Sequence, residues 1–101
     1  MNAFPNIAEG EVESVQFDHT CIHVTMTDGR TISVPLSWYP RLQHATTDEL
    51  NNWELCGGGY GIHWEQLDED LSIQGLLAGS KSGESQASFE KWLANRKQNN
   101  Q

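Results

Sequence analysis

The sequence predicts an α+β fold: a three-stranded antiparallel meander packed by a helix, with a further strand and a C-terminal helix. Three observations lead to this prediction. Apolar and polar residues alternate in the first third of the chain, Asp28-Gly29 separates two alternating segments as hairpin turns do, and Thr46 with Glu49 matches a helix capping box. A chain of 101 residues, 37% of them hydrophobic, fits one domain of modest core with a short appendage.

The meander is predicted from the period-two pattern of its strands. In the middle strand Ile22, Val24 and Met26 share one face, as alternate residues of an extended chain do. Asp28-Gly29 supplies the left-handed backbone that a two-residue hairpin turn requires. The three predicted strands are 11–17, 20–27 and 30–36. The apolar face that these strands share must be buried against another element of the chain.

The next segment is predicted to supply that cover. Thr46 and Glu49 can cap each other's backbone N–H groups, which predicts a helix from Thr47 to Leu55, after a helical turn at 38–42 in which Pro40 stands early. We interpret the glycine run 57–59 as the end of this helix and a wide turn. It is a poor phosphate loop, because it precedes a predicted strand at 62–66 and not a helix.

Composition divides the chain at Ser80. Residues 1–79 form the predicted domain, and residues 80–101 are predicted as a flexible spacer followed by a short amphipathic tail helix. The helix, expected at 88–97, places four side chains on one stripe: Phe89, Trp92, Leu93 and Arg96. So short a helix is marginal alone, and the sequence leaves open whether it docks on its own body or on another molecule.

Charge points to the class of partner. The net charge is −8, but residues 1–79 hold twelve acidic side chains against two basic ones, whereas residues 80–101 hold four basic against two acidic. A body so acidic repels phosphate, which disfavours direct binding of nucleic acid by the body and favours a small basic protein as partner. The sequence has no membrane-length apolar run, and its first residues lack the parts of a signal peptide, so we expect a cytoplasmic protein.

Candidate catalytic and metal-binding residues are few. His19, Cys21 and His23 alternate along one strand and could share a soft metal ion, but no fourth ligand can be located, and we interpret them as a polar face. Asp68, Glu69 and Asp70 are interpreted as a capped turn, since a hard cation needs several converging oxygen ligands.

Nucleophilic catalysis would require Cys56 with His44 or His63. Nearby carboxylates should raise the pKa of this thiol and so lower its reactivity. We therefore predict no catalytic residue, no metal and no cofactor.

The predicted partner-binding residues are mostly aromatic, since aromatic and arginine side chains dominate protein interfaces. Trp38 and Tyr39 are expected as exposed anchors, while Trp53 and Trp64 are expected to pack in the core. A structural alternative for Arg41 is an ion pair with Glu54 or Asp68 that holds the helix to the sheet. The predicted set is Trp38, Tyr39, Arg41, Phe89, Trp92 and Leu93.

Several short motifs occur in an order that resembles the small bacterial family called domain of unknown function 2442 (DUF2442). They include DGRTISVPLSWYPRL, ELNNWEL and GGGYGIHWEQLDEDLSIQGLLAG, and the resemblance covers about Val12 to Gly79. It implies a meander with a helix and a further strand. Members of the family stand alone, are attached to a helix-turn-helix, or are encoded beside a second small protein in the manner of toxin–antitoxin pairs. The residues after Gly79 are too few for a helix-turn-helix.

These observations together predict a non-enzymatic protein-binding module that recognises a small basic protein, with an antitoxin-like role as its most concrete form. Two alternatives remain at this point. One is a transcription-related regulatory subunit that assists nucleic-acid binding through a partner or a homodimer, and the other is a metal-binding sensor or enzyme.

Overall fold

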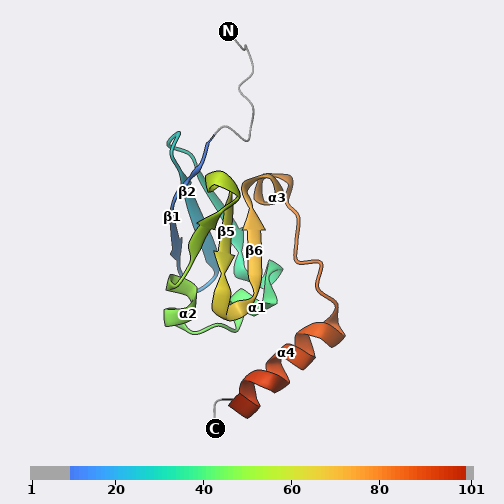
Figure 1. Cartoon of the computed structure of the whole chain (residues 1–101). Coiled ribbons are helices and arrows are strands. Elements are labelled where there is room, and N and C mark those ends of the chain that lie inside the picture. The colour runs from blue at the N-terminus through green and yellow to red at the C-terminus, as the bar shows by residue number, and fades with distance from the viewer. Residues whose placement is uncertain (1–9, 100–101) are drawn as a thin grey trace.

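Two three-stranded antiparallel sheets form the centre of the structure, a computed structural model that describes residues 10–99. The first sheet has the order β1-β2-β3 and the second the order β4-β5-β6. Helices lie at both ends of the sheets (Figure 1). This arrangement confirms the predicted α+β class.

The first sheet is the predicted meander. It consists of β1 (Val12–Phe17), β2 (Cys21–Met26) and β3 (Thr31–Pro35). The alternation holds in β2, where Ile22, Val24 and Met26 are fully buried. At the hairpin turn Gly29 has φ +97°, a left-handed backbone that glycine adopts at little cost. The period-two pattern therefore identified these strands correctly.

The helix predicted from Thr47 to Leu55 is shorter than expected. The capping box forms as predicted, but α2 (Thr47–Asn51) ends four residues early and contributes no fully buried side chain. The following residues form β4 (Glu54–Cys56), which pairs with β5 (Gly61–Trp64). The glycines of the 3-10 turn η2 (Gly57–Gly59) all have positive φ, so this run closes a β-hairpin and does not end a helix.

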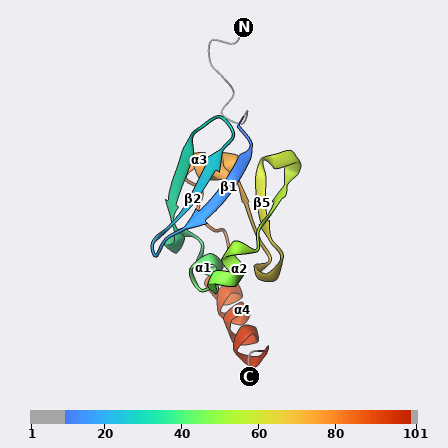
Figure 2. The same cartoon turned by 90° about the vertical axis from the view of Figure 1, so that its left-hand side faces the viewer.

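The second sheet, and not α2, provides most of the cover for the meander. Its third strand is β6 (Glu69–Ser72), reached from β5 through the 3-10 turn η3 (Glu65–Leu67). One apolar cluster joins both sheets, and Figure 2 shows them facing each other with α3 at one end. Trp64 lies at its centre: the side chain is fully buried, its ring meets Phe17 edge-on, and its Nε1 donates to the Leu50 carbonyl at 3.0 Å.

The remaining elements are short turns and helices around this core. The 3-10 turn η1 (Leu36–Trp38) leads into α1 (Pro40–Gln43), and α3 (Ile73–Ala78) follows β6 directly. Ser72 caps α3 and Gly79 ends it with φ +75°. The tail helix α4 (Gln86–Asn99) lies across the end that carries α1 and α2 (Figure 1).

Within residues 10–99, no helix combines the length and the apolar character that a membrane crossing demands.

Candidate functional site

Arg41 attaches the segment that follows Gly79 to the body of the protein. Its guanidinium forms two-pronged hydrogen bonds with Glu84, with Nε 2.9 Å from Oε1 and Nη2 2.5 Å from Oε2, and Nη1 donates to the Leu67 carbonyl at 2.9 Å. The arginine side chain is only 15% exposed. The predicted pairing with Glu54 or Asp68 is therefore wrong, because the segment after Gly79 folds back and brings a closer carboxylate.

The residues predicted as a flexible spacer make backbone contacts with the body. The Tyr39 hydroxyl donates to the Ser80 carbonyl at 2.7 Å, and the Ser82 N–H donates to the Trp38 carbonyl at 3.0 Å. Tyr39 is 3% exposed, and this burial raises the pKa of its hydroxyl. The expectation of Tyr39 as an exposed anchor is wrong, since its ring belongs to the core. Trp38 is half-buried with the Lys81 Nζ 5.5 Å from its ring centre, and its role in binding a partner stays a prediction.

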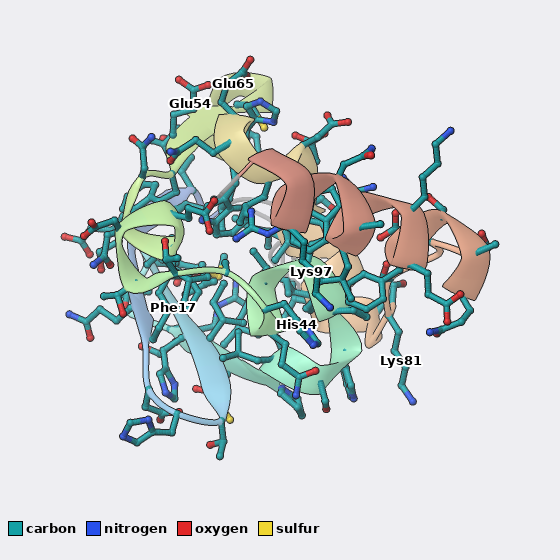
Figure 3. All side chains as sticks on the ribbon, turned by 90° about the horizontal axis from the view of Figure 1, so that it is seen from below. Phe17, His44, Glu54, Glu65, Lys81 and Lys97 are labelled. Atoms are coloured by element: carbon teal, nitrogen blue, oxygen red, sulfur yellow. The ribbon has the colours of Figure 1, made fainter. Side chains whose placement is uncertain are left out.

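The tail helix docks on its own chain. Phe89 is buried and meets the His44 ring edge-on at 5.2 Å. The Trp92 ring contacts two guanidinium groups, with Arg41 5.2 Å and Arg96 4.6 Å from its centre. In the view of this end, His44 lies beside α4 (Figure 3). The sequence left open which surface this helix would cover, and packing within the chain occupies Phe89 and Trp92. Leu93 is half-buried on the same helix.

A pocket of about 320 Å³ opens between β6, α3 and residues 80–84. Four carboxylates and two cations line it: Asp68, Glu69, Asp70 and Glu84 against Arg41 and Lys81. Because Arg41 is already paired with Glu84, the acidic run 68–70 dominates the remaining charge. The position of this run follows from Asp68, which ends η3 in the left-handed conformation (φ 51°) and directly precedes β6.

Glu69 is the acidic residue that faces inward in this pocket. Its strand partner is Trp64, and residues directly opposite in a sheet share a face, so Glu69 lies on the core side of β6 and is half-buried. Burial raises the pKa of its carboxyl, while the Asp70 backbone N–H and the charge of Arg41 act in the opposite direction. A cationic group entering the pocket would relieve this unfavourable burial of a carboxylate.

The outer face of the second sheet carries another group of charges. Glu54, His63 and Asp70 are partners in register across β4, β5 and β6, so they form one row. His63 Nδ1 lies 2.6 Å from an Asp70 oxygen, and Nε2 lies 2.8 Å from Glu65 Oε2. These hydrogen bonds, the one with Glu65 being the stronger influence, raise the pKa of His63 to about 9. Figure 3 shows Glu54 and Glu65 next to each other at this edge.

The metal candidates His19, Cys21 and His23 do not form a close group of ligands. His23 is instead held by Asp18 Oδ2 at 2.7 Å and by Ser33 Oγ at 2.6 Å, and the contact with His23 lowers the pKa of Asp18. Among residues 10–99, the close group of three metal-ligand side chains is Glu54, His63 and Glu65. His63 lies on β5 of the other sheet, so it does not join the candidate ligands near β2.

The two cysteines lie in different sheets and are free. Burial is the main cause that raises the pKa of the Cys56 thiol, and Asp70 and Glu54 raise it further. This agrees with the expected direction. A thiol held protonated in this way is a poor nucleophile.

The sequence motifs match one family model, described as "Protein of unknown function (DUF2442)", over residues 12–82. The chain belongs to the DUF2442 family. The match ends at the start of the segment that carries Glu84, so the acidic run 68–70 lies inside the DUF2442 region and the partner of Arg41 lies outside it.

Two solved structures resemble this DUF2442 protein. A crystal structure of a protein of unknown function from Rhodospirillum rubrum ATCC 11170 is 34% identical, with a TM-score of 0.64, over 78% of this chain and 95% of that one. A solution NMR structure of an uncharacterised protein from Chromobacterium violaceum is 27% identical, with a TM-score of 0.62, over 85% of this chain and 75% of that one. A search of curated proteins finds no match.

Sequence reasoning missed the row on the outer face because it did not assign β4. With residues 54 and 55 in a helix, Glu54 could not be placed opposite His63. The acidic run was noticed, but it was interpreted only as a turn. The signal that could have identified the strand is the glycine run itself, since glycine-rich turns between short segments are typical of hairpins.

Proposed function

We propose that this protein is a non-enzymatic binding module for a small basic protein, with an antitoxin-like role as the concrete form of that function. The observation that supports it best is the pocket lined by residues 68–70, in which Glu69 is half-buried beside Arg41 and Glu84. A lysine or arginine side chain of the partner would enter this pocket. Its charge would stabilise the buried carboxylate, and its hydrogen bonds would go to the carboxylate oxygens.

The distribution of charge supports the same partner. Both fixed cations of residues 1–79 are engaged with acidic side chains, Arg30 with Asp28 at 2.7 Å and Arg41 with Glu84. The acidic residues 54, 65, 68 and 70 are exposed around the second sheet. A basic protein would be steered toward this side by long-range attraction, at a rate that falls as salt is added.

Docking of the tail on the body argues against a role in which the basic residues of the tail contact phosphate. Arg96 is 20% exposed and is paired with Glu49, and Lys81 lies over Trp38. Two of the four tail cations are thus engaged within the chain, which favours a protein partner over nucleic acid.

The binding surface can be tested with peptides before any partner is known. The full chain, labelled with ¹⁵N, is titrated with a lysine-rich peptide, an arginine-rich peptide and a glutamate-rich peptide of equal length. We expect the basic peptides alone to shift the amide signals of residues 68–72 and 80–84. Glu69→Gln should weaken that binding about tenfold, the cost of one charge-assisted hydrogen bond, whereas Glu13→Gln on β1 should leave it unchanged. Equal effects of the two substitutions would contradict the pocket as the binding site.

The partner itself is tested by co-expression with the product of the neighbouring reading frame. We expect a stable complex with a small basic protein, weakened by Glu69→Gln and unchanged by Glu13→Gln. An antitoxin-like role further predicts that cells tolerate the neighbouring protein only when this chain is co-expressed. A neighbour that is neither basic nor bound by this chain would contradict the proposal.

A further inference from the structure

The outer face of the second sheet brings together three groups of the kinds that bind transition metals. The ligand atoms of Glu54, His63 and Glu65 all lie within 4.8 Å of one another. They come from β4, from β5 and from the first residue of η3, and Figure 3 shows Glu54 and Glu65 at the same edge. We propose that this group binds one divalent transition-metal ion, with Zn²⁺ as the best fit, through His63 Nε2 and one carboxylate oxygen each from Glu54 and Glu65.

The distances suit such an ion. Zn²⁺ bonds to nitrogen and oxygen at about 2.0–2.2 Å, which in a tetrahedral site puts ligand atoms about 3.4 Å apart. The present separation of His63 Nε2 from Glu65 Oε2 is 2.8 Å. Both glutamates are exposed, so small rotations of their side chains can open the group to that spacing. The histidine side chain is 22% exposed and is the least exposed of the three.

Asp70 does not bind the proposed ion but holds one of its ligands in place. It accepts a hydrogen bond from His63 Nδ1 at 2.6 Å, which directs Nε2 toward the two glutamates. Histidines that bind metal almost always donate their other ring N–H to a carboxylate or carbonyl in this way. Asp70 is therefore a positioning residue. Because it stands in register with His63 on the adjacent strand, the sheet holds the ring orientation in the absence of an ion.

The chemistry of the ligand set selects the class of metal. One imidazole with two carboxylates suits Zn²⁺ and its neighbours among the transition metals, whereas Mg²⁺ and Ca²⁺ prefer oxygen ligands alone. Three protein ligands would leave a fourth position to water or to a bound molecule.

The test measures Zn²⁺ binding to the full chain by isothermal titration calorimetry, with NMR of the histidine rings to locate the ion. We expect one ion per chain, a change in the His63 ring signals, and Mg²⁺ binding at least tenfold weaker. His63→Ala should abolish this binding, and Asp70→Asn should weaken it about tenfold, the lower end of the effect of such outer contacts. His19→Ala is the matched control, an exposed histidine in the turn between β1 and β2, and should bind like the wild type.

Amide NMR spectra of each variant establish that it is folded before the titration is interpreted. Binding that survives His63→Ala, or ring signals that change at His19 or His23 instead, would overturn the proposal, as would a wild-type chain that takes up no Zn²⁺ at millimolar concentration. None of these outcomes depends on the basic partner, because the peptide test uses Glu69→Gln, a residue outside the ligand set.

Discussion

Arg96 on α4 and Glu49 on α2 form a double hydrogen bond, with both guanidinium nitrogens 2.8 Å from the carboxylate oxygens. The same carboxylate accepts from the Thr46 N–H at 2.9 Å and so completes the capping box of α2. One side chain therefore stabilises the start of a helix and attaches another helix 47 positions away. The attachment is well shielded, since the two side chains are 20% and 15% exposed.

Arg96→Ala should release α4 from the body. The substitution removes two charge-assisted hydrogen bonds and the contact of Arg96 with the Trp92 ring, and we expect a loss of about 1–3 kcal/mol in the free energy of docking. Hydrogen exchange of the amides in α4 measures this, with faster exchange expected in the variant. Lys97→Ala, an exposed cation on the same helix, should exchange like the wild type. Unchanged protection in Arg96→Ala would show that other contacts hold the helix.

Acid should detach the tail before it unfolds the core. The hydrogen bonds from Arg96 are the main cause that lowers the pKa of Glu49 to about 2 from an ordinary 4.5. A depressed carboxyl pKa contributes stability that is complete above 4.5 and is lost as the pH falls toward 2. Trp92 fluorescence or hydrogen exchange in α4 should therefore change between about pH 4.5 and pH 2. Arg96→Met should flatten this change, and a variant with the wild-type pH profile would contradict the assignment to Glu49.

Substitution of Trp64 should be the most damaging change in the core. The side chain is fully buried between the sheets, and Trp64→Ala should cost about 3–5 kcal/mol in the free energy of unfolding. Trp64→Phe keeps most of the ring and removes the donor to the Leu50 carbonyl, so a smaller loss of about 1–3 kcal/mol is expected. Urea denaturation measures both. Trp53→Ala, at a half-buried position, should cost less, and an equal cost would argue against Trp64 as the centre of the core.

Gly61 is required by the close approach of its strand neighbour. A β-carbon at this position would lie 2.8 Å from Cys56 Sγ and 3.4 Å from the Leu71 carbonyl oxygen. Gly61→Ala should therefore destabilise the protein by about 1–3 kcal/mol, the range for overpacked sites. The double substitution Gly61→Ala with Cys56→Ala should recover part of the loss, because it removes the closer contact. Gly83→Ala, where a β-carbon meets nothing within 4 Å, is the control, and thermal denaturation compares the four proteins.

Local signals in the sequence predicted local structure well. The alternation in β2, the Asp28-Gly29 turn and the capping box at Thr46 all form as expected, because each depends on residues within a few positions of one another. The tail helix was also foreseen, with its aromatic stripe. The prediction of a helix through Leu55 was wrong. The local pattern there is compatible with a helix, but the pairing of β4 with β5 makes these residues a strand.

The sequence by itself determined the meander, the helix start at Thr47, the acidic body and the membership in DUF2442. Only the tertiary structure decided that Arg41 binds Glu84, that Arg96 binds Glu49, and that His63 stands between carboxylates of three different segments. These contacts join positions up to 47 apart or depend on the register of the β4-β5 hairpin. A short stretch of sequence does not show where the chain folds back or which carboxylate will lie nearest to an arginine or a histidine. The charged groups from which binding is proposed therefore form only when the whole chain packs.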